Sequence, residues 1–398
     1  MDALKQDVPP SRVSSQPRAG RRGRYPRKVF FLLDSFNIGG TETQAVELAR
    51  RLDPAQYAVT LGYIKPDGPL IDKLRGTSVA LTQFRPKRGV DSPSGVYEIL
   101  RLAAFLRRGR FDIVHTHDLW SNLLGVPAAW LARVPAVISS RRDLAHFDWY
   151  QSRRRVWLKR IQNLSDIVLT NAHPIRDALI SEDGFAPVKV RVVHNGIDLE
   201  RFRVARPRTM EAEEGKRIVL VGNMHSDVKG HRSLIAAAPA IVSEFPATRF
   251  AFVGDGSERP IFEKQISELG LQDNFTFLGR RTDIPEVLAL CDIGVLPSKA
   301  EGLSNAVLEY LAAGLPTVAT NVGGNAEIIK DTVTGLLVPS QDPNALSAAL
   351  LRLLRDPEYA IRLGRAGQNY VREQFSFERL IEETDALYTE LLERRGMN

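Results

Sequence analysis

Short apolar runs rich in β-branched and aromatic residues recur along the chain at intervals too long for β-hairpins. Stretches with helical periodicity separate most of them; within residues 42–52, for example, Ala45, Val46, Ala49 and Leu52 share one face. Strands that alternate with helices predict parallel sheets covered on both faces. The predicted strands are residues 29–36, 59–64, 112–117, 136–140, 166–172, 190–196, 217–223, 249–256, 275–279, 292–298, 316–320 and 335–339.

Residues 199–216 interrupt this pattern, because apolar periodicity disappears there while charged residues, Pro and Gly concentrate. We interpret this segment as a linker between two Rossmann-like domains, at 29–198 and 217–375, followed by a helix at 376–398 that packs across one or both of them. Two such domains facing each other form a cleft, and ligands of open α/β sheets bind beyond the carboxyl ends of the strands. Candidate site residues should therefore follow the strands.

The net charge of +7 is concentrated at one end of the chain, because residues 1–28 supply six of these charges. The remainder is close to neutral, which argues against a nucleic-acid partner. We expect residues 1–28 to form a disordered basic tail; the alternative is a weak tether to anionic lipid or nucleic acid. The single cysteine, Cys291, excludes an intrachain disulfide and favours the cytoplasm. The longest apolar stretch, residues 123–132, is shorter than the ~20 residues that span a bilayer.

Two glycines, Gly39 and Gly40, stand between the first predicted strand and a helix start at Thr41. Because they lack Cβ atoms, a diphosphate or a sugar can approach the backbone and the positive end of the helix. The alternative is that they only make a tight turn. The spacing does not match the dinucleotide G-x-G-x-x-G pattern, and no Walker motif follows.

In the second half, Lys229 follows a strand and precedes a helix, where its ammonium group can neutralise a phosphate oxygen. A solvated surface lysine is the alternative. The next strand ends in a second glycine turn, through Gly254 and Gly256, at the same edge of the sheet.

Two glutamates eight residues apart are the most specific feature. Glu301 lies in a loop after a strand, whereas Glu309 lies about two turns into the following helix. Backbone N–H groups near the start of that helix suit a diphosphate, and the two carboxylates can accept hydrogen bonds from sugar and ribose hydroxyls. Taken alone, the pair could equally lie on a helix surface. The residues between them that offer these N–H groups are Gly302, Leu303, Ser304 and Asn305.

Together with the NGID sequence at 195–198 and GGTE at 39–42, these motifs resemble the family 4 retaining glycosyltransferases of GT-B fold. The resemblance covers residues 29–395, and its specific part is in the C-terminal half. It implies a nucleotide-diphosphate-sugar donor held mainly by the second domain and an acceptor held mainly by the first. It also implies transfer with retained anomeric configuration and a final helix that crosses back to the N-terminal domain.

On this resemblance we assign Glu301, Lys229 and Arg141 to catalysis, and Glu42, His117 and Arg142 to the acceptor. The sequence contains no Asp-x-Asp metal clamp, so we expect neither a metal nor a cofactor, and Lys229 and helix N-termini would stabilise the leaving group. The residues assigned to the donor are Gly39, Gly40, Asn195, His225, Gly254, Gly256, Arg280, Gly302, Leu303, Ser304, Asn305 and Glu309.

Two positions depart from the family pattern. Where the family commonly has an arginine before the lysine, this chain has His225. Where the family often has a histidine after the strand at 136–140, Arg141, Arg142 or His146 could take that place, and the choice stays open. His115 and His117 also face the predicted cleft, although at least one of them is expected to be structural.

Residues 148–164 combine five basic residues with aromatic and apolar ones. Such a segment can lie on an anionic membrane surface, or it can be an ordinary amphipathic helix packed on its domain. The first interpretation fits a lipid-linked acceptor.

The sequence therefore predicts an enzyme that transfers a sugar from a nucleotide sugar to a glycan or lipid-linked acceptor, in the synthesis of bacterial surface glycans. It would be cytoplasmic, with peripheral contact to the inner face of the membrane. The alternatives are a sugar-nucleotide epimerase of the same fold and a non-catalytic protein that binds nucleotide sugars.

Overall fold

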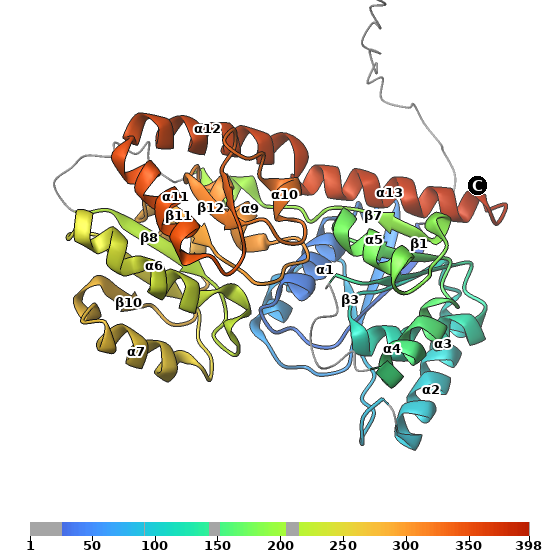
Figure 1. Ribbon diagram of the computed structural model, residues 1–398. Coiled ribbons are helices and arrows are strands. Elements are labelled where there is room, and N and C mark those ends of the chain that lie inside the picture. Colours follow the sequence, from blue (N-terminus) through green and yellow to red (C-terminus); the bar gives the residue numbers. More distant parts are fainter. Residues whose placement is uncertain (1–25, 91, 143–151, 204–214, 398) are drawn as a thin grey trace, which may run out of the picture.

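The computed structural model describes residues 26–90, 92–142, 152–203 and 215–397. These residues form two lobes, each built on a parallel sheet (Figure 1). This arrangement confirms the predicted α/β class with two Rossmann-like domains.

The N-terminal sheet has seven parallel strands in the order β3-β2-β1-β4-β5-β6-β7. Alternate residues of β1 (Arg27–Leu33) point to opposite faces. Phe31 belongs to the core under α1 (Gly40–Arg51) and α13 (Phe377–Glu393), whereas Phe30 belongs to the core under α2 (Pro93–Gly109) and α3 (Leu119–Ala132). The strands are β1 (Arg27–Leu33), β2 (Tyr57–Tyr63), β3 (Ala80–Gln83), β4 (Ile113–Thr116), β5 (Ala136–Ser140), β6 (Ile167–Thr170) and β7 (Val190–Val192).

Helices connect successive strands of this sheet, as right-handed parallel crossovers require. The α-helices are α1 (Gly40–Arg51), α2 (Pro93–Gly109), α3 (Leu119–Ala132), α4 (Ser152–Gln162) and α5 (His173–Ser181). Short 3₁₀ helices lie at η1 (Pro69–Leu74), η3 (Pro187–Lys189) and η4 (Leu199–Phe202).

The C-terminal sheet has six parallel strands in the order β10-β9-β8-β11-β12-β13. Its strands are β8 (Arg217–Val221), β9 (Arg249–Val253), β10 (Phe275–Phe277), β11 (Ile293–Leu296), β12 (Thr317–Thr320) and β13 (Leu336–Val338). The helices around it are η5 (Asp227–Lys229), α6 (His231–Glu244), α7 (Arg259–Glu268), η6 (Gln272–Asn274), α8 (Ile284–Ala289), α9 (Asn305–Ala312), α10 (Asn325–Ile328), α11 (Pro343–Arg355) and α12 (Pro357–Gln374).

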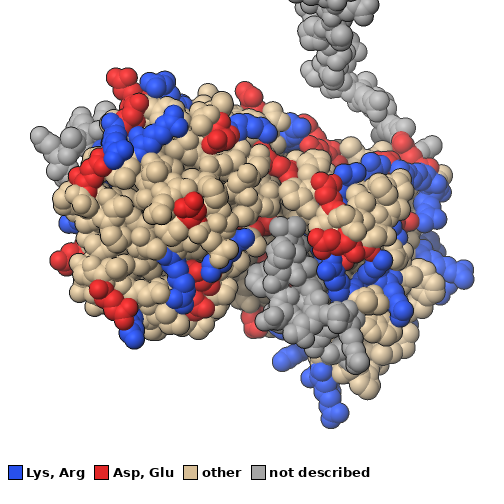
Figure 2. Space-filling model, viewed as in Figure 1, with Lys and Arg blue, Asp and Glu red and all other residues tan. Residues whose placement is uncertain are grey.

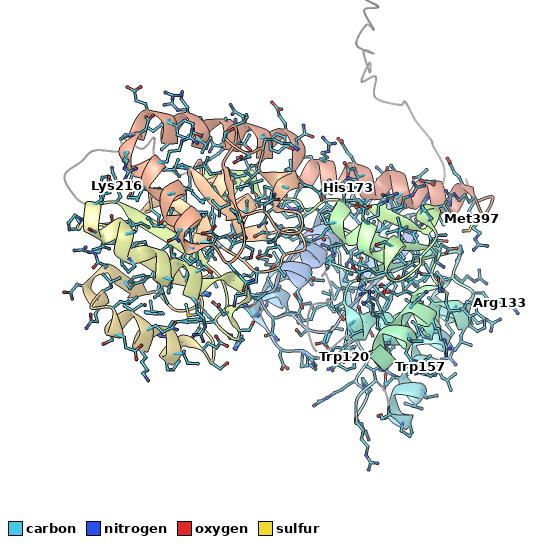
Figure 3. All side chains as sticks on the ribbon, viewed as in Figure 1. Trp120, Arg133, Trp157, His173, Lys216 and Met397 are labelled. Carbon is cyan, nitrogen blue, oxygen red and sulfur yellow. The ribbon has the colours of Figure 1, made fainter. Side chains whose placement is uncertain are left out.

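The last helix, α13 (Phe377–Glu393), returns to the N-terminal lobe, as expected from the family resemblance (Figure 1). Leu380, Leu387 and Leu391 are buried in the core of the N-terminal sheet, and Tyr388 Oη lies 2.8 Å from His115 Nδ1. Met397, just beyond the helix, packs on the same core (Figure 3). The chain therefore crosses between the lobes twice.

One strand and two segment boundaries differ from the predictions. Strand β3 was not predicted, because its short sequence ALTQ is only partly buried and lacks a strong apolar run. Arg27 and Lys28, placed in the tail, begin β1, where the backbone N–H of Arg27 donates to Gln56. The predicted linker starts with η4, whose Phe202 is buried; residues 204–214, and residues 1–25 of the tail, lie outside the described residues.

Within the part of the chain that the structure describes, no helix is both long enough and apolar enough to cross a bilayer.

Candidate active site

A cleft of about 950 Å³ lies between the two lobes. Loops that follow β1, β5, β6 and β7 line it from the N-terminal side, and loops that follow β8, β9 and β11 line it from the C-terminal side. Both sheets thus present the carboxyl ends of their strands to the cleft, where α/β proteins bind ligands.

Lys229 and Glu301 meet on the C-terminal wall. Lys229 Nζ lies 2.7 Å from Glu301 Oε1 and 3.0 Å from Oε2, and Ser298 Oγ donates to Oε1 at 2.6 Å. Gly230 ends η5 with φ of 76°, and a Cβ there would lie 1.9 Å from the Pro297 carbonyl oxygen. This glycine therefore allows the lysine loop to pack directly against the loop that carries Glu301.

The loop from Glu301 to Asn305 leads into α9, as predicted. Gly302, Leu303 and Asn305 line the cleft, whereas Ser304 is buried and caps the helix by accepting from the Val307 backbone N–H at 3.3 Å. Ser304 was assigned to the donor for its backbone N–H group; its side chain caps the helix, and the residue lies outside the cleft lining. The helix start itself faces the cleft and offers its N–H groups there.

Glu309 lines the same cleft, one turn of α9 beyond Asn305. Burial raises its pKa to about 7, and the positive charges of Arg201 and Lys73 only partly oppose this shift. A buried carboxylate with a raised pKa is stabilised by hydrogen bonds from a ligand, and ribose hydroxyls can donate such bonds.

His225, Arg280 and Gly254 complete the C-terminal wall. Arg280 Nη2 lies 3.3 Å from His225 Nε2, so these two assigned donor residues share one corner of the cleft, and Arg280 gives it a positive charge. Gly254 has φ of 139°, and a Cβ there would lie 2.1 Å from the Gly222 carbonyl oxygen. Gly256 lies outside the cleft lining; a Cβ there would meet Met224 and His225, so it allows two loops to pack and does not face a ligand.

The N-terminal wall contains Gly39, Gly40, Glu42 and Arg142. Burial raises the pKa of Glu42 and lowers the pKa of Arg142 to about 10, and each charge partly offsets the shift of the other. A carboxylate and a guanidinium inside one cleft can orient the hydroxyl groups of a sugar.

Hydrogen bonds across the cleft join the two walls at Asn195 and Asn305. Asn195 Nδ2 donates to Asn305 Oδ1 at 2.8 Å, while Asn195 Oδ1 accepts from Arg142 Nη1 at 3.1 Å. The Asn305 side chain is in turn 3.5 Å from the Gly40 carbonyl oxygen. These hydrogen bonds fix the start of α9 relative to the N-terminal loops that line the cleft.

Besides Gly256 and Ser304, two more assigned residues do not reach the cleft lining. Arg141 points the other way: it is buried, and its Nη1 donates to Asp183 Oδ2 at 2.7 Å. Successive residues after β5 alternate in direction, so Arg142 faces the cleft and Arg141 does not, and this geometry does not support the catalytic assignment of Arg141. His146 lies outside the described residues.

His117 is the other residue, at 1% exposed, with its ring stacked on His115 at 4.1 Å. Among the described residues, neither of its ring nitrogens has a hydrogen-bond partner. His115 is structural, because Tyr388 and Ser140 bond both of its nitrogens and burial lowers its pKa to about 3.

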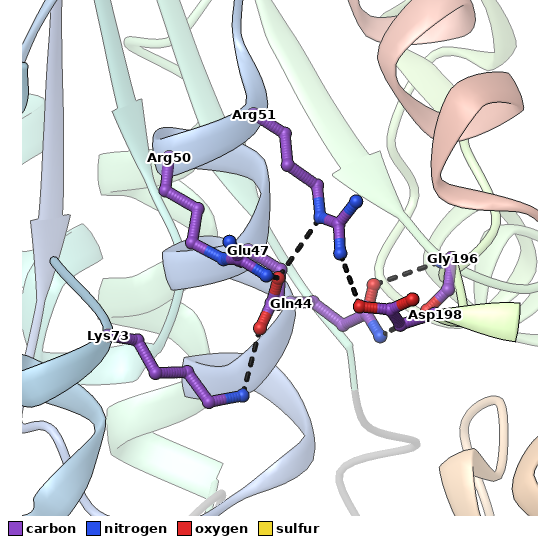
Figure 4. A network of polar contacts seen from close by, with 7 residues as sticks. All are labelled: Gln44, Glu47, Arg50, Arg51, Lys73, Gly196 and Asp198. Carbon is purple, nitrogen blue, oxygen red and sulfur yellow. Dashed lines mark hydrogen bonds and ion pairs between the residues drawn. The ribbon is translucent and has the colours of Figure 1, made fainter. Parts of the chain in front are cut away.

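A polar network fixes α1 against the NGID segment (Figure 4). Gln44 donates to the Gly196 carbonyl at 2.8 Å and accepts from its N–H at 2.9 Å. One turn on, Glu47 accepts from Arg50, Arg51 and Lys73. Burial opposes ionisation of Glu47, but hydrogen bonds from Lys73 and Arg50 outweigh it and lower its pKa to about 2.

Several lining residues were not predicted. Asn171 directly follows β6 and donates to Asn195 at 3.3 Å, so the strand-end rule could have identified it. Arg281, in the loop after β10, and Ile284, the first residue of α8, also line the cleft, and no recognisable motif marks either of them.

Comparison with known proteins gives the family directly. Residues 38–201 match the model described as Glycosyltransferase Family 4, and residues 215–356 match the model described as Glycosyl transferases group 1. A D-inositol 3-phosphate glycosyltransferase of Saccharomonospora viridis is 30% identical over 86% of this chain and 85% of its own length. An Escherichia coli galactosyltransferase named for UDP-Gal and GlcNAc-diphosphoundecaprenol is 26% identical over 89% of this chain and 95% of its own.

Solved structures share the fold over nearly the whole chain. Anabaena HepE in complex with UDP and glucose aligns with a TM-score of 0.79 and 20% identity, over 91% of this chain and 99% of its own. Sucrose-phosphate synthase of Thermosynechococcus elongatus aligns with a TM-score of 0.77 and 21% identity, over 92% and 100%. With the two family models matching one domain each, the chain belongs to the family 4 glycosyltransferases and has their GT-B fold.

Proposed function

We propose that this glycosyltransferase binds a nucleotide-diphosphate sugar on the C-terminal wall of the cleft. Lys229 and the N-terminus of α9 would hold the diphosphate, Glu301 the hydroxyls of the transferred sugar, and Glu309 the ribose. The observation that carries this proposal is the meeting of these groups on one wall, with Lys229 Nζ 2.7 Å from Glu301.

The reaction we infer retains the anomeric configuration and needs neither a metal nor a cofactor. The acceptor oxygen bonds to the anomeric carbon as the bond to the diphosphate oxygen breaks, and a donor phosphate oxygen takes the acceptor proton. Lys229 and the helix N–H groups then stabilise the charge on the leaving diphosphate. The sequence lacks the Asp-x-Asp clamp of metal-dependent enzymes, which supports this view.

A UDP-sugar is the donor that we propose to test first, because the Anabaena neighbour binds UDP and the E. coli relative is named for UDP-Gal. The acceptor would be a glycan or a lipid-linked saccharide placed against Glu42 and Arg142. The relative named for a diphosphoundecaprenol acceptor supports a role in surface glycan assembly. These relatives give no support to the epimerase alternative.

Peripheral contact with an anionic membrane would be made by α4 and its neighbours α2 and α3. Leu158 anchors α4 in its domain, while Trp157 is 61% exposed and Val156 49%. Exposed apolar side chains continue onto α3 with Trp130 and onto α2 with Tyr97. Blue side chains lie along the outer and lower edges of this lobe (Figure 2), and the exposed basic residues described on or beside these helices include Arg107, Arg108, Arg110, Arg133 and Arg160.

The test is a panel of nucleotide sugars, measured by thermal shift and then by nucleotide release with and without acceptors. A ligand at 100 times its Kd adds ~2.7 kcal/mol of stability, so the true donor should stand out. Chelator-treated enzyme should remain active, and NMR of the product should show the donor's anomeric configuration. Turnover that interconverts the donor sugar without an acceptor would favour an epimerase, and binding without either reaction would favour a non-catalytic protein.

A further inference from the structure

Two histidines and a glutamate meet at the junction of the lobes, outside the cleft lining. His173 is the first residue of α5, His194 follows β7, and Glu327 comes from α10 of the C-terminal domain. One ligand atom from each lies within 4.8 Å of the other two. Figure 3 shows His173 where the two lobes adjoin.

The surrounding contacts hold the Glu327 and His194 side chains in place, and Glu327 also contacts the backbone of His173. Glu327 Oε1 accepts from the His173 backbone N–H at 2.7 Å, and Glu327 Oε2 lies 2.7 Å from His194 Nε2. The His194 ring packs edge-on against Phe375, with the ring centres 5.4 Å apart. Tyr370 Oη donates to the Glu327 carbonyl at 3.1 Å, which fixes the short helix α10. Two of the three ligand groups, His194 and Glu327, are therefore ordered without an ion, and the exposed His173 ring lies within reach of them.

We propose that His173, His194 and Glu327 form a Zn²⁺ site that bridges the two domains. Two imidazoles and one carboxylate are a ligand set that Zn²⁺ uses, with water as the fourth ligand, whereas Mg²⁺ prefers oxygen ligands alone. Tetrahedral zinc with bonds of about 2.1 Å separates its ligand atoms by about 3.4 Å. Small side-chain rotations cover that difference, and bonds to the ion replace the contact between His194 and Glu327.

The position of the site gives it a consequence for the cleft. Asn171 and Asn195, beside the two histidines, line the cleft, and Gly324 of the α10 loop donates its backbone N–H to the Gly302 carbonyl at 2.6 Å. An ion held by both domains would fix the lobes relative to each other next to the loop assigned to the diphosphate. Metal-free protein, prepared with a chelator, and zinc-loaded protein should therefore differ in the amplitude of motion between the two domains.

The experiment uses the full chain without a histidine tag, stripped of metal with a chelator and titrated calorimetrically with ZnCl₂ and with MgCl₂. We expect one Zn²⁺ per chain and no Mg²⁺ at the same site. His173→Ala, His194→Ala and Glu327→Gln should each weaken zinc binding by at least about tenfold, since each removes one of three protein ligands. Glu286→Gln, on the exposed side of α8, is the matched control and should bind zinc as the wild type does.

A second measurement locates the ion. Anomalous scattering at the zinc edge from crystals of the loaded protein should give a peak between the three side chains. A peak elsewhere, no binding by the wild type, or equal zinc affinity in the three variants with circular dichroism showing them folded would overturn the proposal.

Discussion

Replacing Lys229 with methionine tests the donor site most sharply, because methionine keeps much of the side chain's length and removes its charge. The lysine stem fits against Gly222, where a Cβ would lie 2.9 Å from Lys229 Cγ, so the variant should keep its local packing. The ammonium group has two roles in the structure: it pairs with the buried Glu301 carboxylate, and it faces the cleft. The variant affects both.

The two roles predict two different magnitudes. Loss of one charge-assisted contact with the donor costs roughly 1.5–3 kcal/mol, which lowers kcat/KM by about ten- to a hundredfold. Glu301 is only 8% exposed, and without the lysine its buried carboxylate would lose its charged partner and keep only the hydrogen bond from Ser298. Folding stability should therefore also fall, by about 1–3 kcal/mol. Adding Glu301→Gln to Lys229→Met removes the unpaired charge and should restore much of that stability without restoring activity.

The assay is steady-state nucleotide release over a range of donor concentrations, with urea unfolding of each variant alongside. Lys264→Met, on the exposed surface of α7, is the matched control and should change neither quantity. A folded Lys229→Met enzyme with kcat/KM within twofold of wild type would remove this lysine from the donor site.

Four further predictions concern other residues. Glu301→Gln should lower kcat more than it raises donor KM, because it orients the sugar, while Glu309→Gln should mainly raise donor KM; the reverse pattern in steady-state kinetics would exchange their roles. Since the pKa of Glu309 is raised to about 7, donor KM should fall as pH rises through 7 in the wild type and stay flat in Glu309→Gln. The pKa of Glu47 is lowered from 4.5 to about 2, so its contribution to folding stability is complete above pH 4.5 and is lost as the pH falls toward 2. With solvent screening allowed for, Glu47→Gln should lower the free energy of unfolding in urea by roughly 2–3 kcal/mol at pH 7 and by less at pH 3. Trp157→Ala with Arg160→Glu should reduce co-sedimentation with anionic vesicles at low salt severalfold. Unchanged sedimentation would favour the alternative, in which α4 is an ordinary amphipathic helix packed on its domain.

The alternation of apolar strands and helices was enough to predict two parallel sheets, because buried parallel strands have near-continuous apolar sequences. It missed β3, whose edge position leaves it partly exposed and without that signal. Asn195 and Arg142, assigned on the family resemblance, and the glutamate loop line one cleft, because the carboxyl ends of parallel strands gather at one edge.

The side-chain details depend on contacts that local sequence does not encode. Arg141 was assigned to catalysis without knowledge of Asp183, 42 residues away, with which its side chain pairs outside the cleft lining. The cap role of Ser304 and the stacking of His117 on His115 likewise depend on backbone direction at single residues. His173, His194 and Glu327 meet only because the two domains pack together, so their proximity carried no signal in the sequence.

The most direct test of the central claim is a crystal structure of the enzyme with UDP bound. We predict the diphosphate against Lys229 and the backbone N–H groups at the start of α9, with the ribose hydroxyls within hydrogen-bonding distance of Glu309. Density for the nucleotide on the N-terminal wall, beside Glu42 and Arg142 and away from Lys229, would contradict the account.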